Sequence, residues 1–291
     1  MTFLKKHHRR QQLRLARFLA ILLAVLFGPW ISCARVAAQE PRPLSASQIV
    51  HQMVEVETAA WKTRQHFLYR NQERSSRTGG RLWDEMVVET SDGSMQRLVA
   101  EDGKPLSGSQ EQAEEQRILY LGDHPAEFRR KSQRRKEDEA RMPELLREIP
   151  NIFLFKTIDS EGDYFRIAFQ SNPSFHEESY QDRVIHAMSG EILIHKTDMR
   201  LCILDGHLDH KVEFGFGILG ELSGQTRLFL ARQEVSSGQW TTTKIRVHLD
   251  GRILLLKSFS RDVDSARSGF RLVPQDLTAA GAAAILRSGT F

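Results

Sequence analysis

The residue types best suited to hold a metal ion gather in residues 205–210, which contain two aspartates and two histidines. If this segment is a strand, successive side chains alternate between the two faces, so His207 and His210 point in opposite directions. A three-ligand zinc site would then need a partner from elsewhere in the sheet, such as His186 or His195. A metal-dependent hydrolase built on these histidines is one hypothesis, and histidines scattered over a sheet surface are the simpler interpretation.

Other patterns that could carry chemistry lack the context that the chemistry needs. Gly215–Gly220 matches the G-x-G-x-x-G pattern of dinucleotide-binding loops. That loop must lead into a helix whose N-terminus meets the pyrophosphate. Here it leads towards Thr226–Gln233, which has strand character, so the glycines more simply allow a strand to bend. The sequence contains no Gly-x-Ser-x-Gly nucleophile elbow. We therefore expect no catalytic residues, no metal and no cofactor.

The N-terminus has the features of an export signal. Six lysines and arginines in Met1–Arg17 precede the apolar run Phe18–Phe27, and a stretch of small residues ends at Ala38. This combination is typical of a secretory signal peptide. The apolar run has ten residues, whereas a membrane-spanning helix needs about 20. We therefore predict a signal peptide over residues 1–38, no transmembrane span in the mature chain, and a periplasmic location.

Two other export routes stay open. Trp30–Cys33 loosely resembles a lipoprotein box, which would leave the mature protein anchored through a lipid on Cys33. Arg9–Arg14 resembles a twin-arginine signal.

Removal of residues 1–38 changes the charge of the protein. The remaining 253 residues carry 34 basic and 37 acidic side chains, a net charge of −3. A nucleic-acid-binding domain needs a basic surface, so that class of function is excluded. The length suits one large domain, which we place at 39–291. Cys202 is then the single cysteine left, and we expect it to be a small buried side chain rather than half of a disulfide.

The pattern after the signal peptide predicts a helix followed by hairpins. Ser45 or Ser47 can cap a helix whose apolar stripe contains Ile49, Val50, Met53, Val54 and Val56. Alternation then predicts strands at Phe67–Arg74, Leu82–Thr90 and Met95–Glu101, joined by the turns Thr78–Gly80 and Asp92–Gly93.

Residues 107–150 form a charged insertion that we expect to be helical over Ser107–Leu121 and Pro125–Ile149. Residues 109–148 hold 9 basic and 10 acidic side chains with almost no apolar stripe. A solvated, ion-paired helix face is the first interpretation, and a surface that docks a partner is the alternative. Attachment to the rest of the fold is expected from Leu145, Leu146, Ile149, Ile152 and Phe153.

From Phe153 onwards the sequence reads as strands. Period-two alternation, as in Ile245, Val247 and Leu249, predicts an antiparallel sheet with one buried face. Turns are expected at Ser189–Gly190, Asp205–Gly206, Ser223–Gly224, Ser237–Gly238 and Asp250–Gly251. The alanine-rich tail Leu277–Leu286 is expected to be a frayed helix or disordered.

Sixteen phenylalanines, many of them in alternating strands, concentrate apolar surface on one face of this sheet. Such a face packs against helices or another sheet, or surrounds an apolar ligand. Core packing accounts for most of these residues, and a ligand cavity is the more specific hypothesis.

Several segments resemble one family of exported proteins. Met188–Gly206 resembles the recurring hairpin of the lipoprotein-carrier superfamily, the LolA/LolB-like outer-membrane lipoprotein-sorting carriers and related periplasmic stress-sensor regulators. Val212–Leu222 and Trp240–Phe259 are similar to uncharacterised exported members. The resemblance implies an α+β fold: a strongly curved antiparallel sheet, an incomplete β-barrel, with an N-terminal helix and the helical insertion covering one side.

In that family the space between sheet and helices holds acyl chains. We therefore expect a non-catalytic protein that binds lipid or lipoprotein acyl chains. The predicted lining residues are Phe165, Ile167, Phe169, Phe214 and Phe216. The alternative is a ligand-free envelope interaction or sensor protein that docks a partner protein through residues 107–150.

Overall fold

The computed structural model describes residues 43–160, 162–214, 220–253 and 257–289. The predicted signal peptide, Cys33, Phe216 and most of Gly215–Gly220 lie outside the described residues. The chain divides into two units, Met1–Pro43 and Leu44–Phe291. All the helices and strands described below lie in the second unit.

The unit begins with helix α2 (Ala46–Lys62), as the apolar stripe predicts. Ser45 caps it through a capping box in which the Ser45 Oγ accepts from the Gln48 N–H and the Gln48 side chain accepts from the Ser45 N–H. The stripe of Ile49, Val50 and Met53 is buried.

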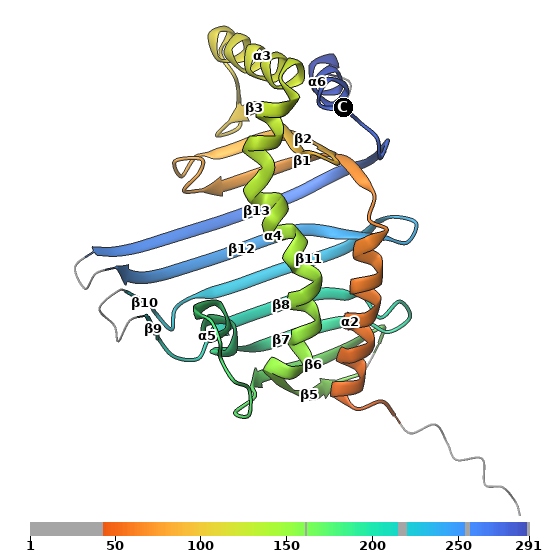
Figure 1. The fold of residues 1–291 in the computed structure, drawn as a ribbon, viewed down its shortest axis with the longest axis vertical. Helices are drawn as coiled ribbons and strands as arrows, with labels where there is room; N and C mark the ends of the chain where they lie inside the picture. Colours follow the sequence, from red (N-terminus) through yellow and green to blue (C-terminus); the bar gives the residue numbers. More distant parts are fainter. Residues whose placement is uncertain (1–42, 161, 215–219, 254–256, 290–291) are drawn as a thin grey trace, which may run out of the picture. The chain divides into compact units, whose positions relative to one another are not determined.

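In the described residues, thirteen strands form one antiparallel sheet. They are β1 (His66–Ser75), β2 (Leu82–Thr90), β3 (Gly93–Glu101), β4 (Lys104–Pro105), β5 (Phe153–Asp159), β6 (Tyr164–Ser171), β7 (Met188–His195), β8 (Leu201–Leu208), β9 (Val212–Phe214), β10 (Gly220–Leu222), β11 (Arg227–Ser236), β12 (Gln239–Ile253) and β13 (Lys257–Val273). The spatial order is β4-β3-β2-β1-β13-β12-β11-β8-β7-β6-β5, with β9 and β10 paired beside β12. The sheet has two free edges and is not closed (Figure 1).

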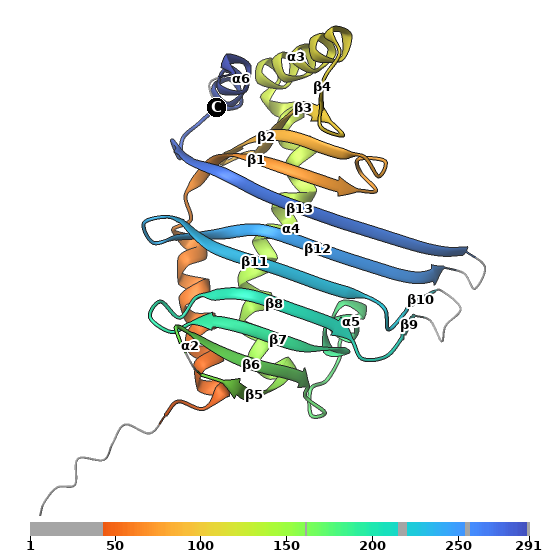
Figure 2. The same ribbon diagram turned by 180° about the vertical axis from the view of Figure 1, so that it is seen from behind.

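The charged insertion consists of α3 (Gly108–Asp123) and α4 (Pro125–Ile152) and connects β4 with β5, the two edges of the sheet. Helix α4 therefore runs across the sheet, on the same side as α2 (Figures 1 and 2). The described residues also form two shorter helices, α5 (Tyr180–His186) and α6 (Ala279–Ser288). The predicted α+β class, with an open antiparallel sheet, an N-terminal helix and a helical insertion over one side, is confirmed.

Two large cores lie at opposite ends of the strand order. One packs α2 and the C-terminal end of α4 on β5–β8, with Met53, Ile152, Ile167 and Ile192 at its centre. The other packs α3, α6 and Phe128 of α4 on β1–β3. Of the residues expected to attach α4, Ile152 and Phe153 are buried in the first core and Leu146 and Ile149 pack against it. Cys202 is buried and free, as predicted.

Three of the predicted turns are wrong, because Gly190, Gly206 and Gly251 lie inside strands. Gly190 pairs with Gly206, and a Cβ at Gly190 would overlap the carbonyl oxygen of Asp205. These glycines permit close approach of neighbouring backbones rather than chain reversal. The predicted turns at Ser223–Gly224 and Ser237–Gly238 do lie between strands.

Two helices also differ from the sequence-based expectation. The alanine-rich tail is the ordered helix α6, whose Ala282 and Leu286 are fully buried because its small side chains fit closely against α3. Helix α5 was not expected; its Ser179 cap accepts from the Asp182 N–H.

Candidate functional site

One face of the sheet can be followed from β2 to β6 by cross-strand pairing, since directly paired residues point to the same side. Starting at β2, the successive pairs are Glu85↔Asn71 and Trp83↔Glu73, Glu73↔Ser265, Ser265↔Ile245, Ile245↔Leu230, Leu230↔Leu204, Leu204↔Ile192 and Ile192↔Ile167. A hydrogen bond from the Ser265 hydroxyl to the Asn71 side-chain oxygen (2.7 Å) crosses from β13 to β1 on this face. We call it the helix face, because α2 and the C-terminal end of α4 pack on it at β5–β8. At the other end of the strand order, α3, α6 and Phe128 pack on Leu68, Met86, Val88 and Met95, which point to the opposite face.

The central strands carry an aliphatic patch on the helix face, which we call the apolar band. It consists of Leu204, Leu228, Leu230, Ile245, Val247 and Val263, placed together by the pairs Leu228↔Val247 and Val247↔Val263 and by those above. Each of the six side chains is half-buried rather than fully buried. By contrast, Ile167 and Ile194 on the outer strands are fully buried under α2.

Helix α4 passes over the apolar band without packing tightly on it. Its N-terminal part is fixed by Phe128 and Ser132, which are buried, and its C-terminal part by Ile152. Of the ten residues 133–142 between these anchors, nine are exposed and Glu139 is half-buried. The middle of α4 therefore acts as a bridge between two cores, and the band beneath it retains accessible apolar surface.

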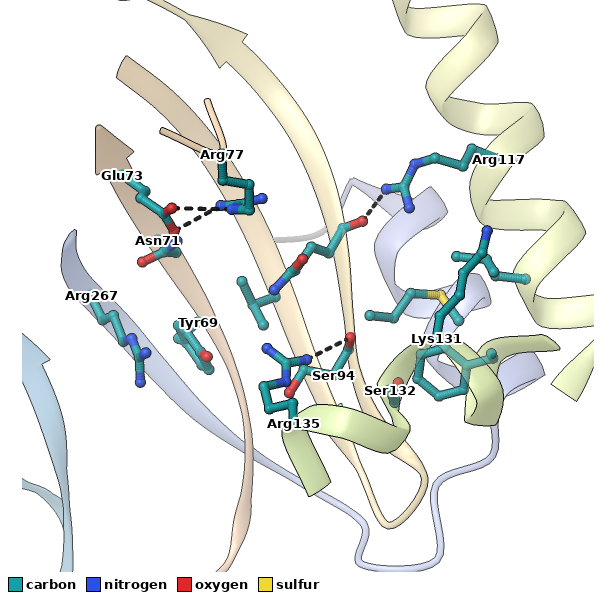
Figure 3. Close-up of a pocket in the computed structure, with 15 residues that line it drawn as sticks. Tyr69, Asn71, Glu73, Arg77, Ser94, Arg117, Lys131, Ser132, Arg135 and Arg267 are labelled. Carbon is teal, nitrogen blue, oxygen red and sulfur yellow. Dashed lines mark hydrogen bonds and ion pairs between the residues drawn. The ribbon is translucent and has the colours of Figure 1, made fainter. Parts of the chain in front are cut away.

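A cavity of about 380 Å³ lies next to the apolar band, between β1–β3, β13 and the helices α3 and α4 (Figure 3). Its apolar wall is formed by Val87, Met95, Leu121 and Phe128. The charged and polar side chains around it are Tyr69, Asn71, Glu73, Arg77, Ser94, Gln96, Arg117, Lys131, Ser132, Arg135 and Arg267. Five of these side chains are cationic and one is anionic, so we call the cavity the cationic pocket.

Two of the five cations are neutralised by carboxylates. Arg77 donates to both oxygens of Glu85 (2.9 and 2.8 Å) and to Glu73 (3.1 and 2.8 Å). These hydrogen bonds raise the pKa of the Arg77 guanidinium further above its ordinary value, so it stays charged. Arg117 pairs with Glu114 at 2.5 Å. Both arginines therefore form walls of the pocket rather than free anion-binding groups.

The remaining cations have weaker partners or none. The Lys131 ammonium lies 3.8 Å from Glu127. The Arg135 guanidinium donates to the Ser94 carbonyl oxygen (3.2 Å), and the Arg267 guanidinium lies over the ring of Tyr69, 5.5 Å from its centroid. In the described part of the chain neither Arg135 nor Arg267 has a carboxylate within ion-pair distance, and the buried Arg267 Nε has no hydrogen-bond partner.

Tyr69 lies between these two arginines (Figure 3). Its side chain is 6 % exposed, and its ring stacks on Phe270 with centroids 5.2 Å apart. Burial raises the pKa of the Tyr69 hydroxyl to about 12, so the group is protonated and can donate a hydrogen bond at neutral pH. Among the described residues that hydroxyl has no hydrogen-bond partner.

The predicted lining residues lie on two separate clusters. Phe165, Ile167 and Phe169 share the helix face of β6, but they belong to the core that α2 covers. Phe214 packs in a smaller cluster with Leu208 and Val212 and makes an edge contact with Tyr180 of α5. The structure thus brings three of the residues together on the expected face, beyond the end of the apolar band.

The apolar band and the cationic pocket were not selected from the sequence. The alternation of Ile245, Val247 and Leu249 was visible, but alternation does not reveal which face stays accessible. The charged insertion was expected to be a solvated face, and part of it instead contacts the β2–β3 hairpin. Lys136 donates to the Ser91 carbonyl (2.8 Å) and Arg129 pairs with Asp92 (3.3 Å).

The candidate metal ligands make other contacts. His195 pairs with Asp198 at 2.7 Å, and His207 lies 3.4 Å from Asp209. Within the described ranges, no group of three or more histidine, cysteine, aspartate or glutamate side chains is placed to hold a metal ion.

Comparison with known protein families finds no family model that matches this chain, and comparison with curated proteins finds no match. In the part of the chain with described coordinates, no helix has both the length and the apolar character needed to cross a membrane.

Proposed function

We propose that this protein is an exported, periplasmic carrier that binds an elongated apolar ligand non-covalently between α4 and the apolar band. The ligand class is an acyl chain, either of a lipid or of a lipoprotein. The observation that supports this most directly is the contrast along the helix face. The core under α2 at one end and the buried cluster of Phe67, Tyr69 and Val87 at the other end flank a half-buried aliphatic patch, over which the middle of α4 is exposed.

The energetics favour a chain rather than a compact ligand. Each methylene that leaves water contributes about 0.8 kcal/mol, so an acyl chain of ordinary length offsets the cost of association. The band extends across four strands, β8, β11, β12 and β13, which suits a ligand lying across them.

The resemblance to lipoprotein carriers and the predicted signal peptide agree with this proposal. Both are features of proteins that work outside the cytoplasm, where acyl chains must be shielded from water in transit. Docking of a partner protein through residues 107–150 stays a prediction. Two basic residues of this segment, Arg129 and Lys136, already bind the β2–β3 hairpin of the same chain.

The test measures lipid binding by the mature protein. Protein purified from its own host should carry lipid in native mass spectrometry, and delipidated protein should bind a fluorescent fatty acid. Ile245→Gln and Leu230→Gln, which put an amide in the apolar band, should each weaken binding about tenfold or more, as expected when apolar contacts are lost. Arg246→Gln, on the opposite face of β12, is the matched control and should bind like the unmodified protein. Absence of bound lipid together with absence of fatty-acid binding would refute the proposal.

A further inference from the structure

The cationic pocket has unused capacity to bind an anion. In the described part of the chain Arg135 and Arg267 face it with no carboxylate within ion-pair distance, and the Arg267 Nε is buried and unpaired. Glu89 interacts with Arg267 and Tyr69 only from a longer distance. Buried polar groups are nearly always hydrogen-bonded, so an unpaired one marks a place where a water molecule or a ligand belongs. Three donors from different elements line this pocket: Tyr69 of β1, Arg267 of β13 and Arg135 of α4.

The Tyr69 hydroxyl is a hydrogen-bond donor with a fixed position in the pocket. The hydroxyl belongs to a side chain that is 6 % exposed, and in the described residues no acceptor is paired with it. The ring is held from two sides, by stacking on Phe270 and by the guanidinium of Arg267. The hydroxyl is therefore fixed in place before any ligand arrives, and the ordering cost of binding is small.

The composition of the cavity wall points to an amphipathic ligand. Val87, Met95, Leu121 and Phe128 form an apolar wall, whereas Arg135, Arg267 and Tyr69 provide charge and donors. A volume of about 380 Å³ is within the usual range for a small-ligand site, roughly 300–1,000 Å³. The pocket also adjoins the apolar band. Arg267 of the pocket and Ser265 are alternate residues on the same face of β13, and Ser265 pairs with Ile245 of the band.

We propose that the cationic pocket binds the oxyanion head group, a carboxylate or a phosphate, of the same amphiphile whose chain lies on the apolar band. In this arrangement the Tyr69 hydroxyl donates to one oxygen and the guanidinium groups of Arg135 and Arg267 pair with the charge. The proposal rests on the proposed function, from which it takes the apolar chain, and adds the charge of the ligand.

The experiment compares two probes that share one chain. Cis-parinaric acid carries a carboxylate, and its methyl ester does not; both are titrated into the delipidated mature protein at constant ionic strength. The acid should bind at least tenfold more tightly than the ester, as expected for hydrogen bonds to a charged group. Tyr69→Phe, Arg135→Gln and Arg267→Gln should each reduce the affinity for the acid about fivefold to tenfold and leave the affinity for the ester unchanged.

Matched controls separate the site from general effects. Arg134→Gln removes a neighbouring exposed charge of α4 that does not line the pocket, and Tyr164→Phe removes an exposed hydroxyl on β6. Both should bind the acid like the unmodified protein. Circular dichroism and the unfolding midpoint report whether each variant is folded, and Tyr69→Phe keeps the ring contacts that pack the strand.

The outcomes distinguish this inference from the function on which it rests. Equal affinity for acid and ester overturns the head-group site and leaves the apolar band in place. Binding of neither probe overturns the proposed function. A third titration with inorganic phosphate identifies the source of the anion. Phosphate binding that Tyr69→Phe abolishes, in a protein that binds neither probe, would support an oxyanion site for a free ion and refute its link to a lipid.

Discussion

Glu57 connects helix α2 to the sheet through a single buried carboxylate oxygen. Its Oε1 accepts from the Arg200 Nε (3.0 Å), from the Arg232 guanidinium (2.6 Å) and from the Leu201 N–H (3.0 Å). The side chains of Glu57, Arg200 and Arg232 are 5 %, 8 % and 17 % exposed. This ion cluster contributes little more to the free energy of unfolding than an apolar contact of the same size would. Removal of one member, however, leaves the other side chains charged and buried without a partner.

Glu57→Gln should therefore destabilise the protein by about 3 kcal/mol, the usual effect of breaking a buried ion pair. The measurement is the free energy of unfolding in urea at pH 7. Glu55→Gln, an exposed position of the same helix, is the control. Equal midpoints for the two variants would show that the buried carboxylate does not carry this role.

The ionised carboxylate of Glu89 should destabilise the folded protein, in contrast to the carboxylate of Glu57. It accepts from the Phe67 N–H (3.1 Å), and burial raises its pKa above the ordinary 4.5 despite opposing interactions with Phe67, Arg267 and Arg64. The folded state thus binds the proton more tightly than the unfolded state, so stability falls as the pH rises through the folded pKa.

Glu89→Gln removes this penalty and keeps an acceptor for the Phe67 N–H. We expect the variant to have a higher urea midpoint than the unmodified protein at pH 7. The difference should vanish well below pH 4.5, where Glu89 is protonated in both the folded and the unfolded state. A difference that persists at low pH would assign the effect to packing rather than to charge.

At the scale of elements, the contact between the β2–β3 hairpin and α4 sets the path of the bridging helix. Gly93 has a φ of +139°, and a Cβ there would overlap the Ser132 side chain of α4. Arg129 and Lys136 bind the same hairpin from one helical turn on either side. The hairpin therefore positions the N-terminal half of α4 over the cationic pocket.

Gly93→Ala combines backbone strain with a clash against α4, and we expect a loss of stability of about 2–3 kcal/mol. Gly238→Ala is the matched control, since its φ is +69° and nothing lies within 4 Å of a Cβ there; it should cost about 1 kcal/mol. Urea unfolding measures both. A loss in Gly93→Ala no larger than the loss in Gly238→Ala would mean that α4 does not press on the hairpin.

The elements themselves were largely predictable, because they are encoded by local signals. Alternation and turn dipeptides gave β1–β3 within about two residues, and the apolar stripe gave α2. The site was not predictable in the same way. Tyr69 has no motif that separates it from any tyrosine in a strand, and the half-burial of Ile245 depends on the path of α4, which is set by Ser132 and Ile152, far away in sequence.

At the scale of the whole described unit, the two cores and the bridge between them should differ in local stability. The cores bury Ile49, Met53 and Ile167 at one end and Ile118 and Leu286 at the other. The middle of α4, residues 133–142, has one half-buried side chain and otherwise exposed ones. A helix with few buried contacts opens at low free-energy cost, whereas core segments open only with global unfolding.

Hydrogen exchange measured by mass spectrometry should therefore show slow amides in β1, β2, β6 and β7 and fast amides in residues 133–142. Saturation with cis-parinaric acid should slow exchange in residues 133–142 at least tenfold, because a chain on the apolar band gives this part of α4 a surface to pack on. Helix α6 packs in a core away from the band and serves as the internal control, with unchanged exchange. Slow exchange throughout α4 in the free protein would indicate that the bridge is already packed, and the apolar band would then have no room for a chain.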